Sequence, residues 1–431
     1  MQNSSPLHFI FMSYISAPLV FFLTLFSTFG AGLPSELTTF PPHHDVAVAN
    51  SLRCLETSKG DYERIAKLRN WVADNLAYFG NGVGALSILR GTRPHYHVPT
   101  GCVDAAVTLL GYPQQDGVKD LLSLALDALP YAVGYSPEVV QYQILQVATL
   151  TRDSSAMQKA WEAEKLTGAK MSARYQSFLQ DWHPNLWNKI LDRLFPHRQW
   201  RPLEKKVTRD EEISWKAERG VDYFTALLLV RLSELRVRSK ESYPSSWIQF
   251  VQGGIRAPSF NTRPAGLSSE LAELARLEGR PDSSLRILRE TWTLLNEWAP
   301  QMTGTYKIER DLAVTLAALT GCQATQEEAV VRLAKRSELA WKHLNDVEQM
   351  YELPLLAEGF HALGEEEQAQ KNWKIATEMC LKNQNPESQS AGLTRIWMSY
   401  ARANTWPTKE TEVLLQKIEK QLPAAYAKVD F

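Results

Sequence analysis

Cys102 is the residue whose type and setting come closest to those of a catalytic nucleophile. Gly101 and Cys102 open the apolar run 103–110, which predicts a helix that begins at the thiol. A thiol at a helix N-terminus is acidified by the helix dipole, and its thiolate is nucleophilic. A thiol enzyme also needs a base, and the residues assign none near Cys102. Thiol catalysis by Cys102 is therefore the alternative function, and the main expectation is a protein that is not an enzyme.

Two histidines form the second group with possible chemistry. His95 and His97 would point the same way in an extended segment, which Pro94 and Pro99 favour. No further histidine or acid lies at a spacing that closes a metal site. We therefore expect no metal and keep His95 and His97 as the alternative ligands. The sequence also lacks a nucleotide-binding glycine signature, and no cofactor is expected.

The charge balance excludes one class of function. Lys plus Arg total 47 and Asp plus Glu total 48, which gives a formal net charge of −1. Dedicated nucleic-acid binders are usually clearly basic, so no nucleic-acid partner is expected. The four cysteines allow two disulfides in an exported chain, Cys54 with Cys102 and Cys322 with Cys380, or else buried free thiols.

Helical hairpins dominate the sequence after residue 45. In the clearest unit, apolar residues spaced by three and four mark one helix, a turn follows, and a second apolar stripe returns. Four such units lie at 268–298, 311–341, 353–380 and 396–422, with their turns at Gly279, Gly321, Gly364 and Asn404. The turns recur about every 42 residues, and a fixed helix–turn–helix period predicts an all-α fold, an α-α superhelix or solenoid. Upstream, 48–55 and 62–76 predict a further hairpin.

The third unit carries a pattern of small and aromatic residues. Its members are Ala357, Phe360, Gly364, Ala369, Trp373 and Ala376. This pattern resembles the tetratricopeptide repeat, although the period here is longer than that family's roughly 34 residues. The resemblance covers about residues 268–422. It implies that a protein or peptide binds on a concave surface formed by the first helices of successive repeats.

The residues expected to contact such a ligand lie on those first helices, around 268–278, 308–320, 352–363 and 393–403. The candidates are the polar side chains Glu273, Arg276, Arg310, Glu358, His361 and Arg402. The expected function is therefore that of a non-catalytic scaffold that binds a protein or peptide.

A second resemblance concerns Cys102. Residues 63–78, which include Trp71 and Asp74, together with Gly101-Cys102 and the later Gly111, look like the front of a transglutaminase-like thiol fold. The resemblance implies that Cys102 is the nucleophile of the alternative function. Downstream, no His-x-Trp strand with a following aspartate strand completes the triad of that fold.

The N-terminal segment predicts export. Residues 1–35 contain no charged side chain apart from His8, and 9–32 is nearly all apolar. This run fits either a cleaved signal peptide that ends near Gly32 or an uncleaved membrane anchor. A signal peptide and an anchor would both lead to export of the remaining chain, which would then be periplasmic, secreted or membrane-anchored.

Four segments are expected along the chain. They are a signal peptide or anchor at 1–32, an N-terminal helical domain at 33–180, a Trp-rich basic linker with irregular loops and one helix at 181–267, and tetratricopeptide-like repeats at 268–431. In the linker, apolar residues spaced by three and four between 187 and 195 form a stripe flanked by cations. This stripe either packs on the repeats or associates with a membrane through 187–209. The Pro-, Gly- and Ser-rich stretch 242–267 predicts surface loops.

Overall fold

The computed structural model describes part of the chain. The described residues are 43–57, 62–92, 97–112, 116–131, 137–151, 153, 155–160, 223–256, 263–296 and 305–422. The chain divides into two compact units, Met1–Pro42 and His43–Phe431, and all described residues belong to the second unit. The predicted signal or anchor and the apolar stripe of 187–195 therefore lie outside the described residues.

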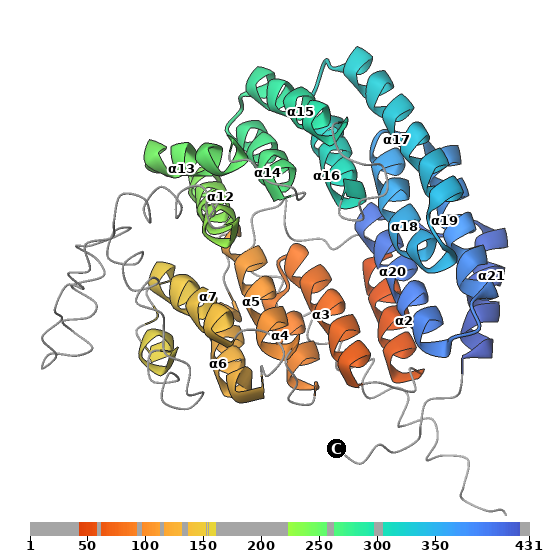
Figure 1. Cartoon of the computed structure of the whole chain (residues 1–431), viewed down its shortest axis with the longest axis horizontal. Helices are drawn as coiled ribbons and strands as arrows, with labels where there is room; N and C mark the ends of the chain where they lie inside the picture. Colours follow the sequence, from red (N-terminus) through yellow and green to blue (C-terminus); the bar gives the residue numbers. More distant parts are fainter. Residues whose placement is uncertain are drawn as a thin grey trace, which may run out of the picture. The chain divides into compact units, whose positions relative to one another are not determined.

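The described residues form an all-α fold, with no strand among them. The first half contains α2 (His44–Thr57), α3 (Tyr62–Tyr78), α4 (Gly82–Arg90), α5 (His97–Leu110), α6 (Val118–Ala128), the 3-10 turn η2 (Leu129–Tyr131) and α7 (Pro137–Leu150). The second half contains α12 (Tyr223–Arg238), α13 (Ser245–Arg256), α14 (Arg263–Leu277), α15 (Pro281–Asn296), α16 (Thr305–Ala317), α17 (Gln323–His343), α18 (Asp346–Ala362), α19 (Glu366–Lys382), α20 (Pro386–Ala403) and α21 (Lys409–Gln421). Figure 1 shows their arrangement.

The four turns predicted from the repeat period are confirmed. Gly279, Gly321 and Gly364 have φ angles of 69°, 74° and 82°, and Asn404 has a φ of 51°. This left-handed conformation ends a helix, and glycine or asparagine adopts it with the least strain. A Cβ atom added at any of the three glycines would meet no neighbouring atom within 4 Å. The backbone conformation alone therefore selects glycine at these turns.

The stretch 242–267, which was predicted to be irregular, contains helix α13 and the start of α14. The prediction of surface loops was wrong here. The Pro, Gly and Ser content of the stretch is typical of loops, but a short apolar stripe within it forms a helix. Trp247, Ile248 and Val251 of α13 pack with α12 and α14 in one apolar cluster. Burial of this stripe against two neighbours supplies the stability that the local composition does not.

Alternate helices of the second half form a continuous row. Helix α14 packs against its hairpin partner α15, and α18 packs against α19. Within the row, α12 contacts α14, α14 contacts α16, α16 contacts α18, and α18 contacts α20. Trp373 of α19 is fully buried behind this row and donates a hydrogen bond from Nε1 to Ser399 Oγ at 2.8 Å. Tryptophan thus fills the space between long helices, as its stripe position predicts.

The row returns to the first half at both ends. At one end α12 packs against α5 and α7, and α5 packs against α3. At the other end α20 packs against α3 and, much more extensively, against α2. The helices α3, α5, α12, α14, α16, α18 and α20 therefore form a closed circuit of contacts within this unit (Figure 1). We call them the inner helices.

Helix α2 joins the two ends of the circuit. It was expected to form a hairpin with α3, but its principal partner is α20. Ser390 Oγ donates a hydrogen bond to the carbonyl of Cys54, and Ser51 Oγ lies 3.4 Å from the carbonyl of Thr394. Ala47 and Cys54 of α2 are buried in the same apolar cluster as the last repeats. We call the contact of α2 and α3 with α18 and α20 the seam.

Arg395 forms the polar centre of the seam. Its guanidinium lies 4.0 Å from the ring centroid of Trp71 on α3 and 4.6 Å from that of Tyr351 on α18. Burial lowers the pKa of Arg395, and the carboxylate of Glu352 opposes this shift. A cation held between two aromatic rings in a partly buried contact stabilises by about 1–2 kcal/mol. One side chain of α20 thereby links both halves of the unit.

Replacing Gly364 by alanine tests the repeat turn. The new Cβ forces an unfavourable left-handed conformation, so we expect the free energy of unfolding to fall by about 1 kcal/mol. Urea unfolding of the wild type and the G364A variant measures this change. The neighbouring, exposed Glu365→Ala serves as the control and should change stability by less than about 0.5 kcal/mol. Equal losses of unfolding free energy in the G364A and E365A variants would contradict the left-handed turn at Gly364.

Replacing Arg395 by methionine tests the seam. The substitution keeps the apolar stem but removes the cation from Trp71, Tyr351 and Glu352, so we expect a loss of about 2–4 kcal/mol in urea unfolding. Lys371→Met is the matched control, because Lys371 Nζ lies 4.5 Å from the ring centroid of Trp341 at an exposed position. That loss should stay below about 1 kcal/mol. A small loss for both variants would show that the seam does not depend on Arg395.

Candidate binding site on the inner helices

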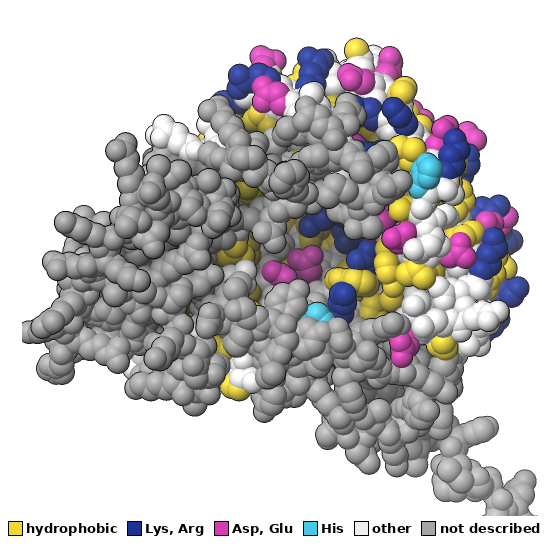
Figure 2. Space-filling view, viewed as in Figure 1, with side chains coloured by type: hydrophobic (Ala, Val, Ile, Leu, Met, Phe, Trp, Pro, Cys, Tyr) yellow, Lys and Arg dark blue, Asp and Glu magenta, His cyan; other side chains and the backbone are white. Residues whose placement is uncertain are grey.

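Charged side chains recur on the inner helices at helical spacing. They are Asp74 on α3, Asp104 on α5, Arg231, Glu234 and Arg238 on α12, Glu270, Glu273 and Arg276 on α14, Lys307, Arg310 and Asp311 on α16, Glu358 on α18 and Arg402 on α20. Steps of three and four residues keep side chains of one helix on one side. Figure 2 shows acidic and basic side chains together in the central, hollowed part of one face. We call this set the charged inner face.

Three of the predicted binding residues meet in one network. Arg310 Nη1 lies 3.2 Å from Glu358 Oε2, and Arg402 donates to both oxygens of Glu358 from Nη2 at 2.9 Å and from Nε at 3.0 Å. Only 4% of the Glu358 side chain is exposed. Two guanidinium groups around one buried carboxylate hold each other in place through charge-assisted hydrogen bonds. The network joins α16, α18 and α20.

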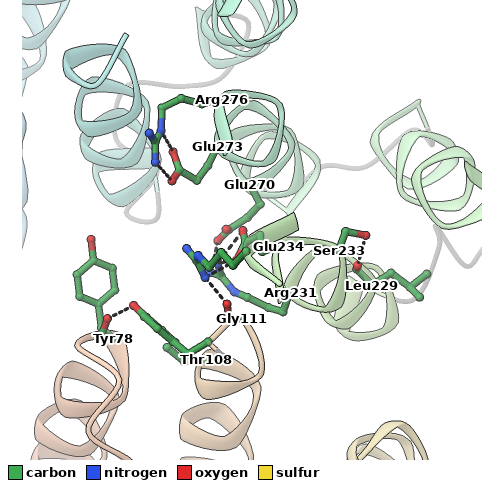
Figure 3. Close-up of polar contacts among 12 residues, drawn as sticks. Tyr78, Thr108, Gly111, Leu229, Arg231, Ser233, Glu234, Glu270, Glu273 and Arg276 are labelled. Atoms are coloured by element: carbon green, nitrogen blue, oxygen red, sulfur yellow. Dashed lines mark hydrogen bonds and ion pairs between the residues drawn. The ribbon is translucent and has the colours of Figure 1, made fainter. Parts of the chain in front are cut away.

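A second network lies at the opposite end of the row (Figure 3). Arg231 Nη1 donates to Glu234 Oε2 at 2.9 Å, and Arg231 Nη2 donates to Glu270 Oε1 at 2.9 Å. Arg238 donates to the carbonyl of Gly111, which ties α12 to the end of α5. Burial raises the pKa of Glu270 to about 7, although the charge of Arg231 acts in the opposite direction. This network joins α5, α12 and α14.

The remaining predicted binding residues are placed separately. Glu273 and Arg276 pair within α14, with Arg276 Nη2 2.7 Å from Glu273 Oε1, and Figure 3 shows this pair on the same side as Tyr78. His361 Nδ1 lies 2.6 Å from Glu366 Oε2 on α19. Thus Arg310, Glu358 and Arg402 converge, Glu273 and Arg276 form their own pair, and His361 is paired towards α19.

Sequence reasoning missed a group of residues on α3 and α5. Thr108 Oγ1 donates to Asp74 Oδ1 at 3.3 Å, and Asp104 lies one turn before Thr108. Burial, followed by repulsion from Asp74, raises the pKa of Asp104 to about 7, and the charge of Lys307 on α16 opposes the shift. Asp104 is the only acidic residue of helix α5, and this isolated charge in a mostly apolar segment is the signal that could have identified it.

Tyr78 connects the two halves electrostatically. Burial raises its pKa, and the charges of Arg310, Asp311, Glu358 and Arg402 all act on it. Nevertheless, 46% of Tyr78 is exposed, and Asp104 and Lys307 are exposed as well. Side chains can be both accessible and poorly solvated where they line a narrow recess between helices. The charged inner face therefore brings residues from distant parts of the chain around one water-accessible recess, the hollow seen in Figure 2. Figure 3 shows those of its residues that lie on α3, α12 and α14.

Cys102 does not have the setting of a nucleophile. Helix α5 begins at His97, so Cys102 lies beyond its first turn and not at its start. The side chain is fully buried in the core, and this burial raises the pKa of the thiol far above its usual range. A buried thiol of this kind is inert. The thiol of Cys102 was expected to be acidified by a helix N-terminus. This prediction was wrong, because α5 begins at His97 and Cys102 is buried within the helix.

Of the two alternatives for the cysteines, the disulfides are not found: none of the four cysteines is joined to another in the described part of the chain. Cys54 and Cys102 belong to different apolar clusters, and Cys54 instead shares its cluster with Cys380. Burial raises the pKa of the thiols of Cys54, Cys102 and Cys380. The alternative of buried thiols outside a disulfide therefore describes these three cysteines.

Two further expectations concern metals and membranes. His95 lies outside the described residues, whereas the backbone carbonyl of His97 accepts a hydrogen bond from Asn70 Nδ2 at 2.7 Å. No group of three His, Cys, Asp or Glu side chains is arranged as metal ligands in the described part of the chain. Among the helices from α2 to α21 that the structure describes, none combines the length and the apolar character needed to cross a bilayer.

Comparisons with protein-family models, curated proteins and solved structures found no match to this chain. The fold and the site define its class: an all-α protein of packed helices with a charged inner face.

Replacing Asp104 by asparagine tests the electrostatics of the recess. The folded protein holds the Asp104 proton to a higher pH than the unfolded chain does, so ionisation between about pH 4 and 7 lowers stability. We expect D104N to be more stable than the wild type at pH 8, by about 1 kcal/mol because water screens this accessible carboxylate, with no gain at pH 4. Urea unfolding at both pH values measures the difference.

The control for this prediction is Glu327→Gln, which neutralises an exposed carboxylate on α17. This variant should not gain stability between pH 4 and pH 8. If D104N gained no more than E327Q at pH 8, the raised pKa of Asp104 would be contradicted.

Proposed function

We propose that this protein is a non-catalytic scaffold that binds a protein or peptide segment on its charged inner face. The observation that carries the proposal is the network of Arg310, Glu358 and Arg402, in which three helices present fixed, oppositely charged groups beside a water-accessible recess. Donors and acceptors that are already held in place lose little conformational freedom when a ligand binds to them. Peptides offer carboxylates, ammonium groups and backbone amides, which match such a mixed surface.

The finer description of the fold belongs to the same proposal. We propose that residues 268–422 are tetratricopeptide-like repeats in an α-solenoid arrangement, with α14, α16, α18 and α20 as the first helices. The four turns and the row of alternate helices support this description. In that arrangement the first helices present the binding surface, and Glu273, Arg276, Arg310, Glu358 and Arg402 lie on them.

We also propose that the chain is exported, with residues 1–32 as a signal peptide or membrane anchor. The support is the apolar run 9–32 without Lys, Arg, Asp or Glu. Fractionation of the native host with an antibody to the repeats tests this location. Recovery of the protein in the cytoplasmic fraction alone would contradict it.

Thiol catalysis is not proposed, because the structure provides no reactive thiol at Cys102. Its side chain is buried and its pKa is raised. The inner face is the better basis for a function, because partners hold its buried charged groups in place and Tyr78, Asp104 and Lys307 on the same face are exposed.

A displayed library of random linear peptides tests the proposed function. We expect the wild-type protein to enrich peptides that carry both acidic and basic residues. The Arg402→Met variant should bind the enriched peptides at least about tenfold more weakly, since it removes one cation of the network and leaves Glu358 with fewer donors. Fluorescence anisotropy with labelled peptides measures the affinities.

The matched control is Lys342→Met, which removes an exposed cation from the last turn of α17. Its affinity for the same peptides should remain within about twofold of the wild type, because a distant exposed charge contributes little. Thermal unfolding verifies that both variants are folded. Enrichment of no peptide, or equal affinities for R402M and the wild type, would refute binding on this face.

A further inference from the structure

Two arginines of the charged inner face are held in the same way. Arg402 on α20 donates from Nε to Oε2 of Glu358 at 3.0 Å and from Nη2 to Oε1 at 2.9 Å. Arg276 on α14 donates from Nε to Oε2 of Glu273 at 2.8 Å and from Nη2 to Oε1 at 2.7 Å (Figure 3). Each guanidinium is therefore fixed in orientation by both oxygens of one carboxylate.

The third nitrogen of both guanidinium groups has no acceptor. Nη1 of Arg276 and Nη1 of Arg402 make no hydrogen bond within the described part of the chain. The two side chains are 29% and 20% exposed, so both are partly accessible to water. A donor that a bidentate partner already orients loses little freedom when a further acceptor binds to it.

Arg310, which lies between them in the row, shows which acceptor suits the third nitrogen. Its Nε donates to Asp311 Oδ1 at 2.8 Å, its Nη2 donates to the same oxygen, and its Nη1 donates to Glu358 Oε2 at 3.2 Å. One guanidinium thus binds two carboxylates on this face, the first through Nε and Nη2 and the second through Nη1. Arg276 and Arg402 repeat the first half of this arrangement, and their Nη1 is the place for a second carboxylate.

We propose that the ligand supplies one carboxylate to Nη1 of Arg276 and another to Nη1 of Arg402. This inference rests on the proposed function, because it names the chemistry that the peptide site recognises. The source of each carboxylate is an acidic side chain of the peptide or, at one of the two places, its C-terminus. Glu273 and Glu358 are positioning residues, since they orient the two guanidinium groups without contact with the ligand.

The spacing of the two arginines limits the ligand further. Helix α14 contacts α16, α16 contacts α18, and α18 contacts α20, so three helix-to-helix steps separate Arg276 from Arg402. Packed helices lie about 8–10 Å apart, which makes this part of the row about 25–30 Å long. An extended peptide advances about 3.3 Å per residue and covers that length in about eight residues. The expected ligand is therefore an extended segment with two carboxylates about eight positions apart.

Fluorescence anisotropy with labelled glycine-serine peptides tests the proposal. Three peptides carry a C-terminal amide and two glutamates that are two, eight or fourteen positions apart. A fourth keeps the eight-residue spacing but replaces the second glutamate by a free C-terminus. We expect the eight-residue spacing to bind at least about fivefold more tightly than the other two spacings. Tighter binding of the fourth peptide than of its amidated counterpart identifies the C-terminus as one source.

Substitutions in both molecules separate a contact from a structural effect. With the wild-type protein, replacing either glutamate of the best peptide by glutamine should weaken binding at least about threefold. One of these replacements should have no further effect in Arg276→Met, and the other should have none in Arg402→Met. A general loss of structure would not produce this crossed pattern. Lys342→Met, which removes an exposed cation of α17, is the control and should keep all affinities within about twofold of the wild type.

Several results would overturn this inference. They are the absence of binding by all four peptides, equal affinities at the three spacings, or glutamine replacements that act alike in R276M and R402M. The proposed function fails by a different result, namely that the peptide library yields no ligand that depends on Arg402. If library peptides depend on Arg402 but keep their affinity when their carboxylates are replaced by amides, only the carboxylate chemistry is wrong.

Discussion

The seam between the two ends of the described unit is the contact on which the rest of the structure depends. Helix α2 packs on α20, and the guanidinium of Arg395 lies between the rings of Trp71 and Tyr351. Without these contacts, α3 and α5 would have no fixed relation to α16, α18 and α20 on that side. With them, the inner helices close a circuit and their polar faces surround one recess.

The charges of that recess follow from the closure. A carboxylate in a poorly solvated place is costly unless cations accompany it. Arg231, Arg310 and Arg402 provide such cations for the second half of the chain. Asp74 and Asp104, contributed by the first half, meet no arginine in contact.

Local features of the sequence predicted the helices and their turns well. Gly279, Gly321, Gly364 and Asn404 end helices because few residues tolerate a left-handed backbone, and this requirement is visible in a single chain. The stripe positions likewise placed Trp292 and Trp373 in the core. Local composition misled at α13, where an apolar stripe among Gly, Pro and Ser residues forms a helix by packing on its neighbours.

The site was predictable only in part. Arg310, Glu358 and Arg402 were predicted as binding residues because they lie on the first helices of the repeats. Asp74 and Asp104 join them through contacts between segments more than 200 residues apart in the sequence, and no local period encodes such a pairing. The prediction for Cys102 was wrong because it depended on the residue at which α5 begins. Helix boundaries are weakly specified by the sequence.

The closure of the chain is tested most directly by the distance between α2 and α21. Arg53 Nη2 and Glu419 Oε2 lie 3.9 Å apart at this end of the seam. Spin labels at R53C and E419C, with the partly exposed Cys322 replaced by serine, report that distance by electron paramagnetic resonance. We predict strong dipolar broadening in the doubly labelled protein, absent from both single-label controls. A doubly labelled spectrum equal to the sum of the single-label spectra would contradict the packing of α2 on the last repeats and, with it, the seam that holds the two ends of the circuit together.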